Sequence, residues 1–433
     1  MDVAQVAIAF AIMLGLLLIG MPIAVIMVVL GAVGGLLTLG WPLVESLGSV
    51  VWGVQNENIL TAISLFILLG ELLLRSGIAD RMYAALSIWL GWLPGGLLHT
   101  NIGCCALFAA TSGSSVATAA TIGTVALPAL NERNYSKRQS LGSLAAGGTL
   151  GILIPPSVNL LVYGSLTNTS VGQLFVAGII PGVLLTLVFM GYIAVTNLGD
   201  RSYQAEIKLP LGARIAALRH LIPPVMIFFV VMGSIYFGIA TPTESAAIGV
   251  MAALGFAWHA GARSFRFLHQ CFIHTARTTG MVLLIITGAF ILNVTLALLG
   301  VAQTMTAWVA ALGLSPTGLL LALIVFYLLL GMFMDVLSMQ VLTIPIAVPV
   351  VIQVGSDPIW FGIFVVLMCE LGLITPPVGM NLYVVQGVRQ DRGEFSEVIW
   401  GALPYALLML AFTGLLIAWP ELALWLPRKM IGP

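Results

Sequence analysis

Two stretches of the chain combine residue types that bind small cations, although each lies within an apolar region. One is Ser112–Ser115, in TSGSSVATAATIGTVALP, and the other is Gly147–Ser157, which contains the proline pair of LGILIPPSVNL (150–160). In lipid, a broken helix persists only where protein or a water-filled cavity accepts its freed N–H and C=O groups. Such breaks mark substrate and ion sites in transporters. We therefore predict one small-ion site here, the alternative being close packing of helices through small residues.

The pattern occurs a second time, which weakens the packing alternative. LGLITPPVGMN (371–381) corresponds to LGILIPPSVNL, and PIAVP (345–349) corresponds to TVALP (124–128), both at one constant offset that takes Pro155 to Pro376. We expect two related cation sites near the middle of the membrane. The first comprises Ser112, Gly113, Ser114 and Ser115 opposite Gly147, Gly151, Ile154 and Pro155, and the second comprises Met334, Asp335 and Ser338 opposite Thr375, Pro376 and Gly379.

The chemistry expected of these sites is the binding of ions, without covalent catalysis. Proline frees a backbone carbonyl, and carbonyl and hydroxyl oxygens suit a hard cation such as Na⁺. The N-termini of half-helices favour an anion. We thus expect a Na⁺ ion at each of the two sites and an anionic organic substrate between them. The residues expected to bind this substrate are Ser115, Pro156, Asn159, Pro377 and Asn381.

Four acidic residues in or beside apolar segments have alternative interpretations. Asp335 is either a cation ligand or the N-cap of the following helix, and the two roles are not exclusive. Glu71 is interpreted as a partner of Arg75 one turn later. Glu244, after Pro242, is expected to begin a helix. Glu370 is either part of a proton or cation relay or, the preferred interpretation, a buried hydrogen-bonded acid that supports the second break.

The composition is that of a polytopic membrane protein. Of 433 residues, 60% are hydrophobic and only 7% are charged, where a soluble protein carries roughly 25% charged residues. The net charge of zero suggests no nucleic-acid partner. The five histidines lack metal-binding spacing, so no cofactor is expected besides the coupling ion. No histidine or lysine base is predicted near TSGSS, so we do not expect an enzyme.

Hydropathy predicts an all-α fold built from two repeats, 1–196 and 222–433, joined by a polar cytoplasmic linker at 197–221. Each repeat has five full crossings and one re-entrant hairpin, which gives ten spans and two hairpins. Because five is odd, the second repeat must be inverted. The expected spans are 3–20, 22–39, 58–75, 138–166, 172–196, 222–238, 245–260, 275–298, 358–388 and 397–420; the hairpins are 95–130 and 317–353, and the broken helices 138–166 and 358–388. Amphipathic segments are expected at 80–92 and 302–313.

The distribution of basic residues gives an orientation. With these spans, fourteen of the sixteen lysines and arginines fall on one side of the membrane, and only Arg428 and Lys429 fall on the other. The positive-inside rule makes the first side the cytoplasm. Both termini are then expected on the periplasmic side.

Together these motifs resemble the large membrane subunit, the DctM-like permease, of tripartite ATP-independent periplasmic (TRAP) transporters. The resemblance covers both repeats through TSGSSVATAATIGTVALP, SLAAGGTLGILIPPS, VAGIIPG, ATPTESAA and GLITPPVGMNLYV. It implies import of a small organic acid across the bacterial inner membrane, driven by a Na⁺ gradient and an elevator movement. It also implies two protein partners, a small four-helix membrane subunit and a soluble periplasmic substrate-binding protein. By motif, it places the family's cation sites at Ser112, Ser114, Gly151 and Ile154, and at Asp335, Thr375 and a carbonyl near Pro376–Met380.

Other functions remain as alternatives. An autonomous Na⁺–carboxylate symporter of similar architecture would need no partner for uptake. An ion channel with two symmetric filters would carry currents far above the turnover of a carrier. An intramembrane hydrolase would use a serine of TSGSS and would label with a serine-reactive probe. No arginine lies close to either break in the sequence, so the group that meets a substrate carboxylate is not evident.

Overall fold

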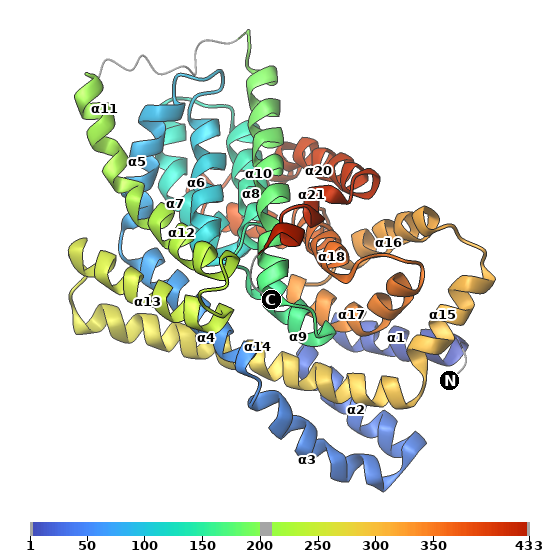
Figure 1. The fold of residues 1–433 in the computed structure, drawn as a ribbon. Coiled ribbons are helices and arrows are strands. Elements are labelled where there is room, and N and C mark those ends of the chain that lie inside the picture. The colour runs from blue at the N-terminus through green and yellow to red at the C-terminus, as the bar shows by residue number, and fades with distance from the viewer. Residues whose placement is uncertain (1–2, 200–209, 431–433) are drawn as a thin grey trace.

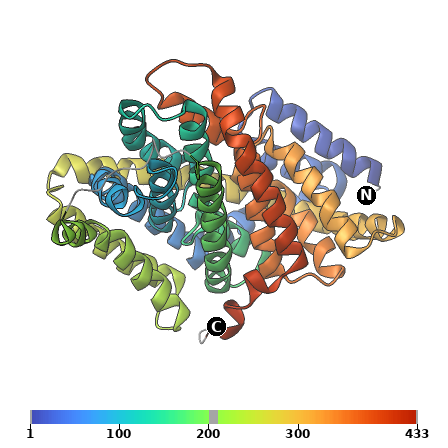
Figure 2. The same cartoon turned by 90° about the horizontal axis from the view of Figure 1, so that it is seen from above.

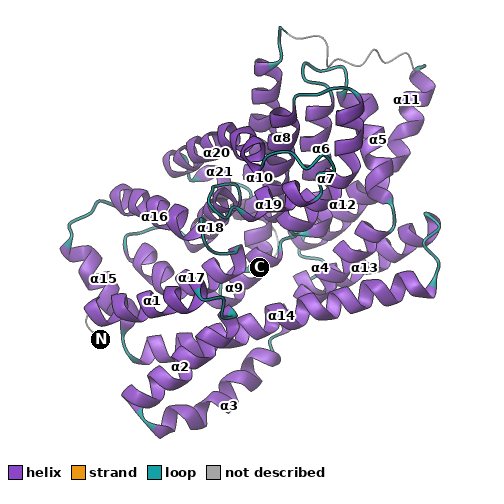
Figure 3. Cartoon of the chain, turned by 180° about the vertical axis from the view of Figure 1, so that it is seen from behind, coloured by secondary structure: helices purple, strands orange, loops and turns teal. Residues whose placement is uncertain are grey.

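Every regular element in the described part of the chain is a helix (Figures 1 and 3). The structure is a computed structural model, and it describes residues 3–199 and 210–430. A helix satisfies all its backbone N–H and C=O groups within one segment, which an apolar environment requires. The predicted all-α class is therefore confirmed.

The helices of the first half run up to the end of the polar linker. They are α1 (Val3–Leu18), α2 (Ile23–Leu39), α3 (Trp41–Gln55), α4 (Asn58–Arg75), α5 (Ile78–Leu90), α6 (Leu97–Ser112), α7 (Ser115–Glu132), α8 (Lys137–Leu153), α9 (Val158–Thr167), α10 (Val171–Thr196), α11 (Leu211–Ala217) and the 3-10 turn η1 (Leu218–His220).

The helices of the second half follow. They are α12 (Ile222–Tyr236), α13 (Pro242–His259), α14 (Phe265–Leu298), α15 (Val301–Ala311), α16 (Pro316–Gly331), α17 (Val336–Gln353), α18 (Pro358–Leu373), α19 (Met380–Gly387), α20 (Phe395–Ala418), α21 (Glu421–Leu424) and η2 (Pro427–Lys429).

The element order of the first half recurs in the second. A long helix (α4 or α14), a shorter one (α5 or α15) and a hairpin (α6–α7 or α16–α17) are followed by an interrupted pair (α8–α9 or α18–α19) and a long helix (α10 or α20). The proline pairs lie in the interruptions, and both Pro155–Pro156 and Pro376–Pro377 are cis. Five helices are long and apolar enough to cross a membrane, and bent pairs bring the number to eight among the described residues.

Three features differ from the predicted spans. Residues 41–55 form α3, a helix that hydropathy did not reveal because Glu45, Ser46, Ser49 and Gln55 dilute its apolar character. Helix α14 begins at Phe265 rather than near residue 275, and its 34 residues extend about 51 Å. Within the predicted linker, 211–220 is helical, and 200–209 lies outside the described residues.

The hairpins and interrupted helices form the centre of the molecule, and α2, α4 and α14 flank them (Figure 1). Helix α14 runs across the width of the view with α2 along it, and α4 packs against it too. Helix α8 contacts α6 and α7 of its own half and α18 and α20 of the other. Seen from above, α20 and α10 run close to one another near the middle (Figure 2). The core therefore joins segments of both halves.

Helix α8 approaches α20 through glycine on both sides. A Cβ at Gly401 would collide with the backbone carbonyl of Arg138, and one at Gly142 would collide with the carbonyl of Gly401. Backbone atoms cannot move aside as a flexible side chain does. The pair thus depends on two residues without side chains.

We predict that Gly401→Ala destabilises the protein by about 1–3 kcal/mol, the usual cost of overpacking. The measurement is the fraction of monodisperse protein after heating in detergent. The control is Gly414→Ala on the same helix, where nothing lies within 4 Å of the new Cβ and the helix propensity of alanine is better by roughly 1 kcal/mol. If the two variants kept the same fraction of monodisperse protein after heating, the close packing of α8 against α20 would not be important for stability.

Candidate functional site

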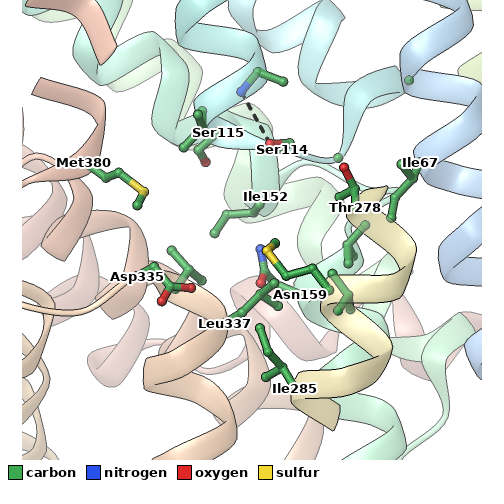
Figure 4. Close-up of a pocket in the computed structure, with 18 of the residues that line it drawn as sticks. Ile67, Ser114, Ser115, Ile152, Asn159, Thr278, Ile285, Asp335, Leu337 and Met380 are labelled. Atoms are coloured by element: carbon green, nitrogen blue, oxygen red, sulfur yellow. Dashed lines mark hydrogen bonds between the residues drawn. The ribbon is translucent and has the colours of Figure 1, made fainter. Parts of the chain in front are cut away.

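One cavity of about 610 Å³ brings the two hairpin tips together (Figure 4). Its lining includes Ser112–Ala117 from the first tip and Asp335–Ser338 from the second. The interrupted helices reach it as well, through Ile152, Val158 and Asn159 in the first half and Leu373 and Met380 in the second. Segments from the two halves, far apart in the sequence, therefore face the same space.

The first tip is a tight turn between α6 and α7. Gly113 has φ +61°, and Ser114 is the N-cap of α7, with its Oγ accepting the N–H of Ala117 at 3.4 Å. The hydroxyl of Thr118 donates to the carbonyl of Ser114 at 2.8 Å and lies 2.9 Å from the hydroxyl of Ser112. The turn thus gathers two serine hydroxyls and a carbonyl, the hard oxygen groups that bind Na⁺.

The first interruption packs against this tip through backbone. A Cβ at Gly113 would lie 2.8 Å from the carbonyl oxygen of Pro156. A Cβ at Gly151 would lie 2.7 Å from the carbonyl of Ser114. The sequence placed Ser114 and Gly151 on opposite sides of one site, and the structure has them in contact distance.

The second tip presents a carboxylate in place of a hydroxyl. Asp335 corresponds to Ser114 at the offset that relates the two proline pairs, and it is likewise the N-cap of its helix, α17. Its carboxylate accepts the backbone N–H of Ser338 at 3.2 Å and also the hydroxyl of the same residue. The capping role considered from the sequence is therefore confirmed. Within the described residues, no lysine or arginine forms an ion pair with Asp335.

The second interruption also contacts its own hairpin through backbone. The N–H of Val378 donates to the carbonyl of Met332 at 3.2 Å. A Cβ at Gly372 would lie 2.7 Å from the Cα of Gly331, so α18 and α16 touch at these two glycines. Gly379, with φ +45°, precedes the first residue of α19.

Several predicted residues contribute to the surroundings of the cavity but do not line it. Gly147 faces Cys105 of α6, whose Sγ would be 2.8 Å from an added Cβ. Thr375 donates its hydroxyl to the carbonyl of Leu371 at 2.6 Å. Asn381 is fully buried and donates to the carbonyl of Ala145 at 3.4 Å. The other predicted residues absent from the lining are Gly151, Ile154, Pro155, Pro156, Met334, Pro376, Pro377 and Gly379.

Asn159 is the predicted substrate residue whose geometry is most open to a ligand. It lies in the first turn of α9, lines the cavity, and is only 6% exposed. Its side-chain oxygen has no hydrogen-bond partner in the described part of the chain. A buried polar atom without a partner is costly, and a ligand donor or water would offset that cost.

The opposite wall of the cavity was not predicted. It consists of Pro22–Ala24 of α2, Ile67, Gly70, Glu71 and Leu74 of α4, and Thr278, Met281, Val282, Leu284 and Ile285 of α14. Most of these residues lie in apolar helical stretches. Pro22 immediately precedes α2, and Glu71 was interpreted only as the partner of Arg75, so no pattern placed either of them at the cavity. None of the described residues that line the cavity is a lysine or arginine.

The interpretations of Glu71 and Glu244 are confirmed, whereas Glu370 is buried and hydrogen-bonded as expected but bonds to residues of the first half instead of supporting the second break. Glu71 pairs with Arg75 at 2.7 Å, one helical turn away. Glu244 completes a capping box with Thr241 at the start of α13. Glu370 is fully buried and hydrogen-bonded beside the second interruption.

An ion-pair cluster joins the two interrupted helices at one end. Arg389, after α19, pairs with Asp391 and Glu397, and Lys137 at the start of α8 pairs with Asp391 at 2.7 Å. The hydrogen bond from Arg389 holds the pKa of Asp391 well below its usual value. The end of α19 is thereby connected to the beginning of α8.

The fold and the cavity together define a helical membrane transporter. The fold is similar to that of the YdaH transporter of Alcanivorax borkumensis, with a TM-score of 0.65 over 95% of this chain and 98% of that one. The identity between the two sequences is 16%, so this likeness concerns the fold alone.

The chain belongs to the family described as the DctM component of the tripartite ATP-independent periplasmic transporter, whose model matches residues 10–422. It is 32% identical to the C4-dicarboxylate TRAP transporter large permease protein DctM of Vibrio cholerae, over 99% of this chain and 98% of that protein. It is 34% identical to the protein of the same name from Rhodobacter capsulatus, over 98% and 99%. It is 31% identical to the sialic acid TRAP transporter large permease protein SiaM of V. cholerae, over 97% of both. The predicted family is confirmed: the protein is a TRAP large permease rather than an enzyme.

We predict that Gly113→Ala lowers the thermal unfolding temperature more than Gly313→Ala does. Both glycines have φ +61°, so both variants bear the left-handed strain of about 1–2 kcal/mol. Only the Cβ at Gly113 meets another segment, the carbonyl of Pro156; at Gly313 nothing lies within 4 Å. The measurement is intrinsic-fluorescence unfolding in detergent. A Gly113→Ala variant as stable as Gly313→Ala would show that the tip does not depend on this contact.

Proposed function

We propose that this permease imports a small organic acid by Na⁺-coupled secondary transport, with one cation at each hairpin tip and the acid between them. The observation that carries the proposal is the shared cavity, to which both tips and both interrupted helices contribute. An arrangement with two separate cavities would not couple the ions to the substrate.

The chemistry of the two tips supports cation binding. Ser112 and Ser114 supply hydroxyls, and the close approach of Gly151 places α8 beside them. Asp335 supplies a carboxylate that lacks a basic partner in the described residues and faces a mostly apolar cavity. A charge in such surroundings is costly unless it is paired, and a bound Na⁺ would pair it. The predicted cation residues that do not line the cavity would act through backbone oxygens or by positioning.

The acid would meet helix N-termini instead of arginine. Helices α7, α9 and α17 all begin at the cavity, with Ser115, Val158 and Val336 in their first turns. Their free N–H groups and dipoles favour an anion. The unpartnered oxygen of Asn159 would accept a hydroxyl or N–H from the substrate. Pro156, Pro377 and Asn381 would then belong to the supporting layer.

The two walls of the cavity suggest how transport proceeds. One wall belongs to the hairpins and interrupted helices, and the other to α2, α4 and α14, where apolar residues predominate. Apolar surfaces make few directional contacts that movement would break. We infer an elevator in which the two inverted repeats contribute the moving part and α2, α4 and α14 remain fixed. The protein would lie in the bacterial inner membrane, with both termini periplasmic.

We predict that Asp335→Asn raises the Na⁺ concentration that gives half-maximal thermal stabilisation by about tenfold or more, because a charged ligand of the cation is lost. Asparagine still caps a helix, so the variant separates cation binding from capping. The control is Asp357→Asn, which alters the carboxylate that caps α18 and accepts the N–H of Ile359. The measurement is Na⁺-dependent thermal stabilisation of the purified protein at constant ionic strength with K⁺. Wild-type Na⁺ dependence in both Asp335→Asn and Ser114→Ala would refute the assignment.

A second prediction concerns the partners. Relatives are named for C4-dicarboxylate, sialic acid and ectoine, so these three are the labelled probes. We expect uptake into proteoliposomes only when the small four-helix subunit and the periplasmic binding protein are both present with a Na⁺ gradient. Uptake by the large chain alone would support the autonomous symporter, and currents far above carrier turnover would support the channel.

The contact with the small subunit is proposed to lie on α5 and α15, the helices of the predicted amphipathic segments 80–92 and 302–313. In the uptake-competent complex, photo-crosslinkers on the exposed faces of these helices should capture that subunit.

A further inference from the structure

Glu370 is a buried acid that connects the two halves beside the cavity without lining it. It lies in the last turn of α18, and its side chain is 0% exposed. The hydroxyl of Ser115 lies 2.8 and 3.0 Å from its two carboxylate oxygens. The backbone N–H of Ile152 donates to one of them at 3.1 Å. A residue of the second half therefore holds two segments of the first.

Both partners of Glu370 contribute to the cavity. Ser115 begins α7 at the first tip, and Ile152 lies in the last turn of α8. The residues immediately before them, Ser114 and Gly151, are the pair whose backbones come into contact. By bonding to Ser115 and Ile152, Glu370 fixes the distance between the tip and the end of α8, where the proposed cation oxygens converge.

In the described part of the second half, residues 222–430, no matching connection holds the second tip. At the offset that takes the first proline pair to the second, Glu370 corresponds to Thr149, and Ser115 corresponds to Val336, which has no hydroxyl. Thr149 donates to the carbonyl of Ala146 in its own helix at 2.6 Å, and its hydroxyl also lies 3.8 Å from the Sδ of Met409 in α20, which is not part of a hairpin. The two tips are therefore held differently: among the residues that the structure describes, only the first tip is bonded to a carboxylate of the other half.

We propose that Glu370 is a positioning residue for the first cation site: through Ser115 and Ile152 it sets the affinity of that site for Na⁺. The proposal rests on the Na⁺-coupled function inferred above. It predicts that weakening the hydrogen bonds of Glu370 to Ser115 and Ile152 raises the Na⁺ concentration that half-saturates the first site, because the oxygens of that site are no longer held at binding distance. Leaving a buried donor or acceptor without its hydrogen-bond partner is enough to change an equilibrium constant by roughly tenfold or more.

The test measures Na⁺-dependent thermal stabilisation of the purified full-length chain, with K⁺ replacing Na⁺ at constant ionic strength. Glu370→Leu and Ser115→Ala should each raise the half-maximal Na⁺ concentration about tenfold. Glu370→Gln, which keeps an acceptor for Ile152 and a polar partner for Ser115, should remain within about threefold of wild type. The double variant with Glu370→Leu and Ser115→Ala should have the same half-maximal Na⁺ concentration as Glu370→Leu alone, because both substitutions remove the same hydrogen bond.

Thr149→Val is the matched control at the related position, and its Na⁺ dependence should equal that of wild type. A purely structural role would lower the unfolding temperature without Na⁺ but leave the half-maximal concentration unchanged, and that result would overturn the proposal. The proposal would also be overturned if Thr149→Val raised the half-maximal Na⁺ concentration as much as Glu370→Leu does. If wild type responds to Na⁺ and the variants have the same half-maximal Na⁺ concentration as wild type, the proposed role of Glu370 is wrong but the proposed Na⁺ coupling is not affected. A wild type without any Na⁺ response would defeat both this inference and the proposed function.

Discussion

The structure depends on the requirement that backbone polar groups in an apolar interior find partners. Two helices are interrupted at the centre of the molecule, at residues 154–157 and 374–379. Each interruption frees backbone groups that a continuous helix would satisfy. At the second interruption a hairpin supplies a partner, because the N–H of Val378 donates to the carbonyl of Met332. At the first interruption the carbonyl of Pro156 packs closely against Gly113 of the other hairpin. The hairpins and interruptions consequently form one unit, and the cavity lies where the hairpin tips end.

Three carboxylates near this unit have different surroundings, and the differences indicate different roles. Glu71 is neutralised by Arg75 within its own helix. Glu370 is enclosed and bonded to a hydroxyl and a backbone N–H. Asp335 faces the cavity and, within residues 3–199 and 210–430, is bonded only to Ser338. Of the three, Asp335 is the carboxylate that remains accessible to a mobile cation.

The two halves of the chain correspond at a constant sequence offset, but corresponding positions do not carry the same chemical groups. Ser114 and Asp335 occupy corresponding positions and cap corresponding helices, yet one offers a hydroxyl and the other a carboxylate. Thr149 and Glu370 correspond as well, but among the described residues only Glu370 bonds to a hairpin tip of the other half, whereas Thr149 contacts Met409 of α20. The two tips therefore present different side chains, a hydroxyl and a carboxylate, to one cavity.

The sequence by itself determined the helical class, the breaks at the proline pairs, the constant offset between the two repeats and the family, because these depend on composition and local motifs. It also identified the capping role of Asp335 and the pairing of Glu71 with Arg75, which are contacts within one or two turns. It missed α3, since scattered polar residues lower the hydropathy of that helix, and it could not place the wall formed by α2, α4 and α14. That wall, the contact between Ser115 and Glu370, and the meeting of two tips in one cavity join residues far apart in the chain. Only the tertiary structure decided them, because such contacts depend on how helices pack and leave no periodicity or spacing in the sequence.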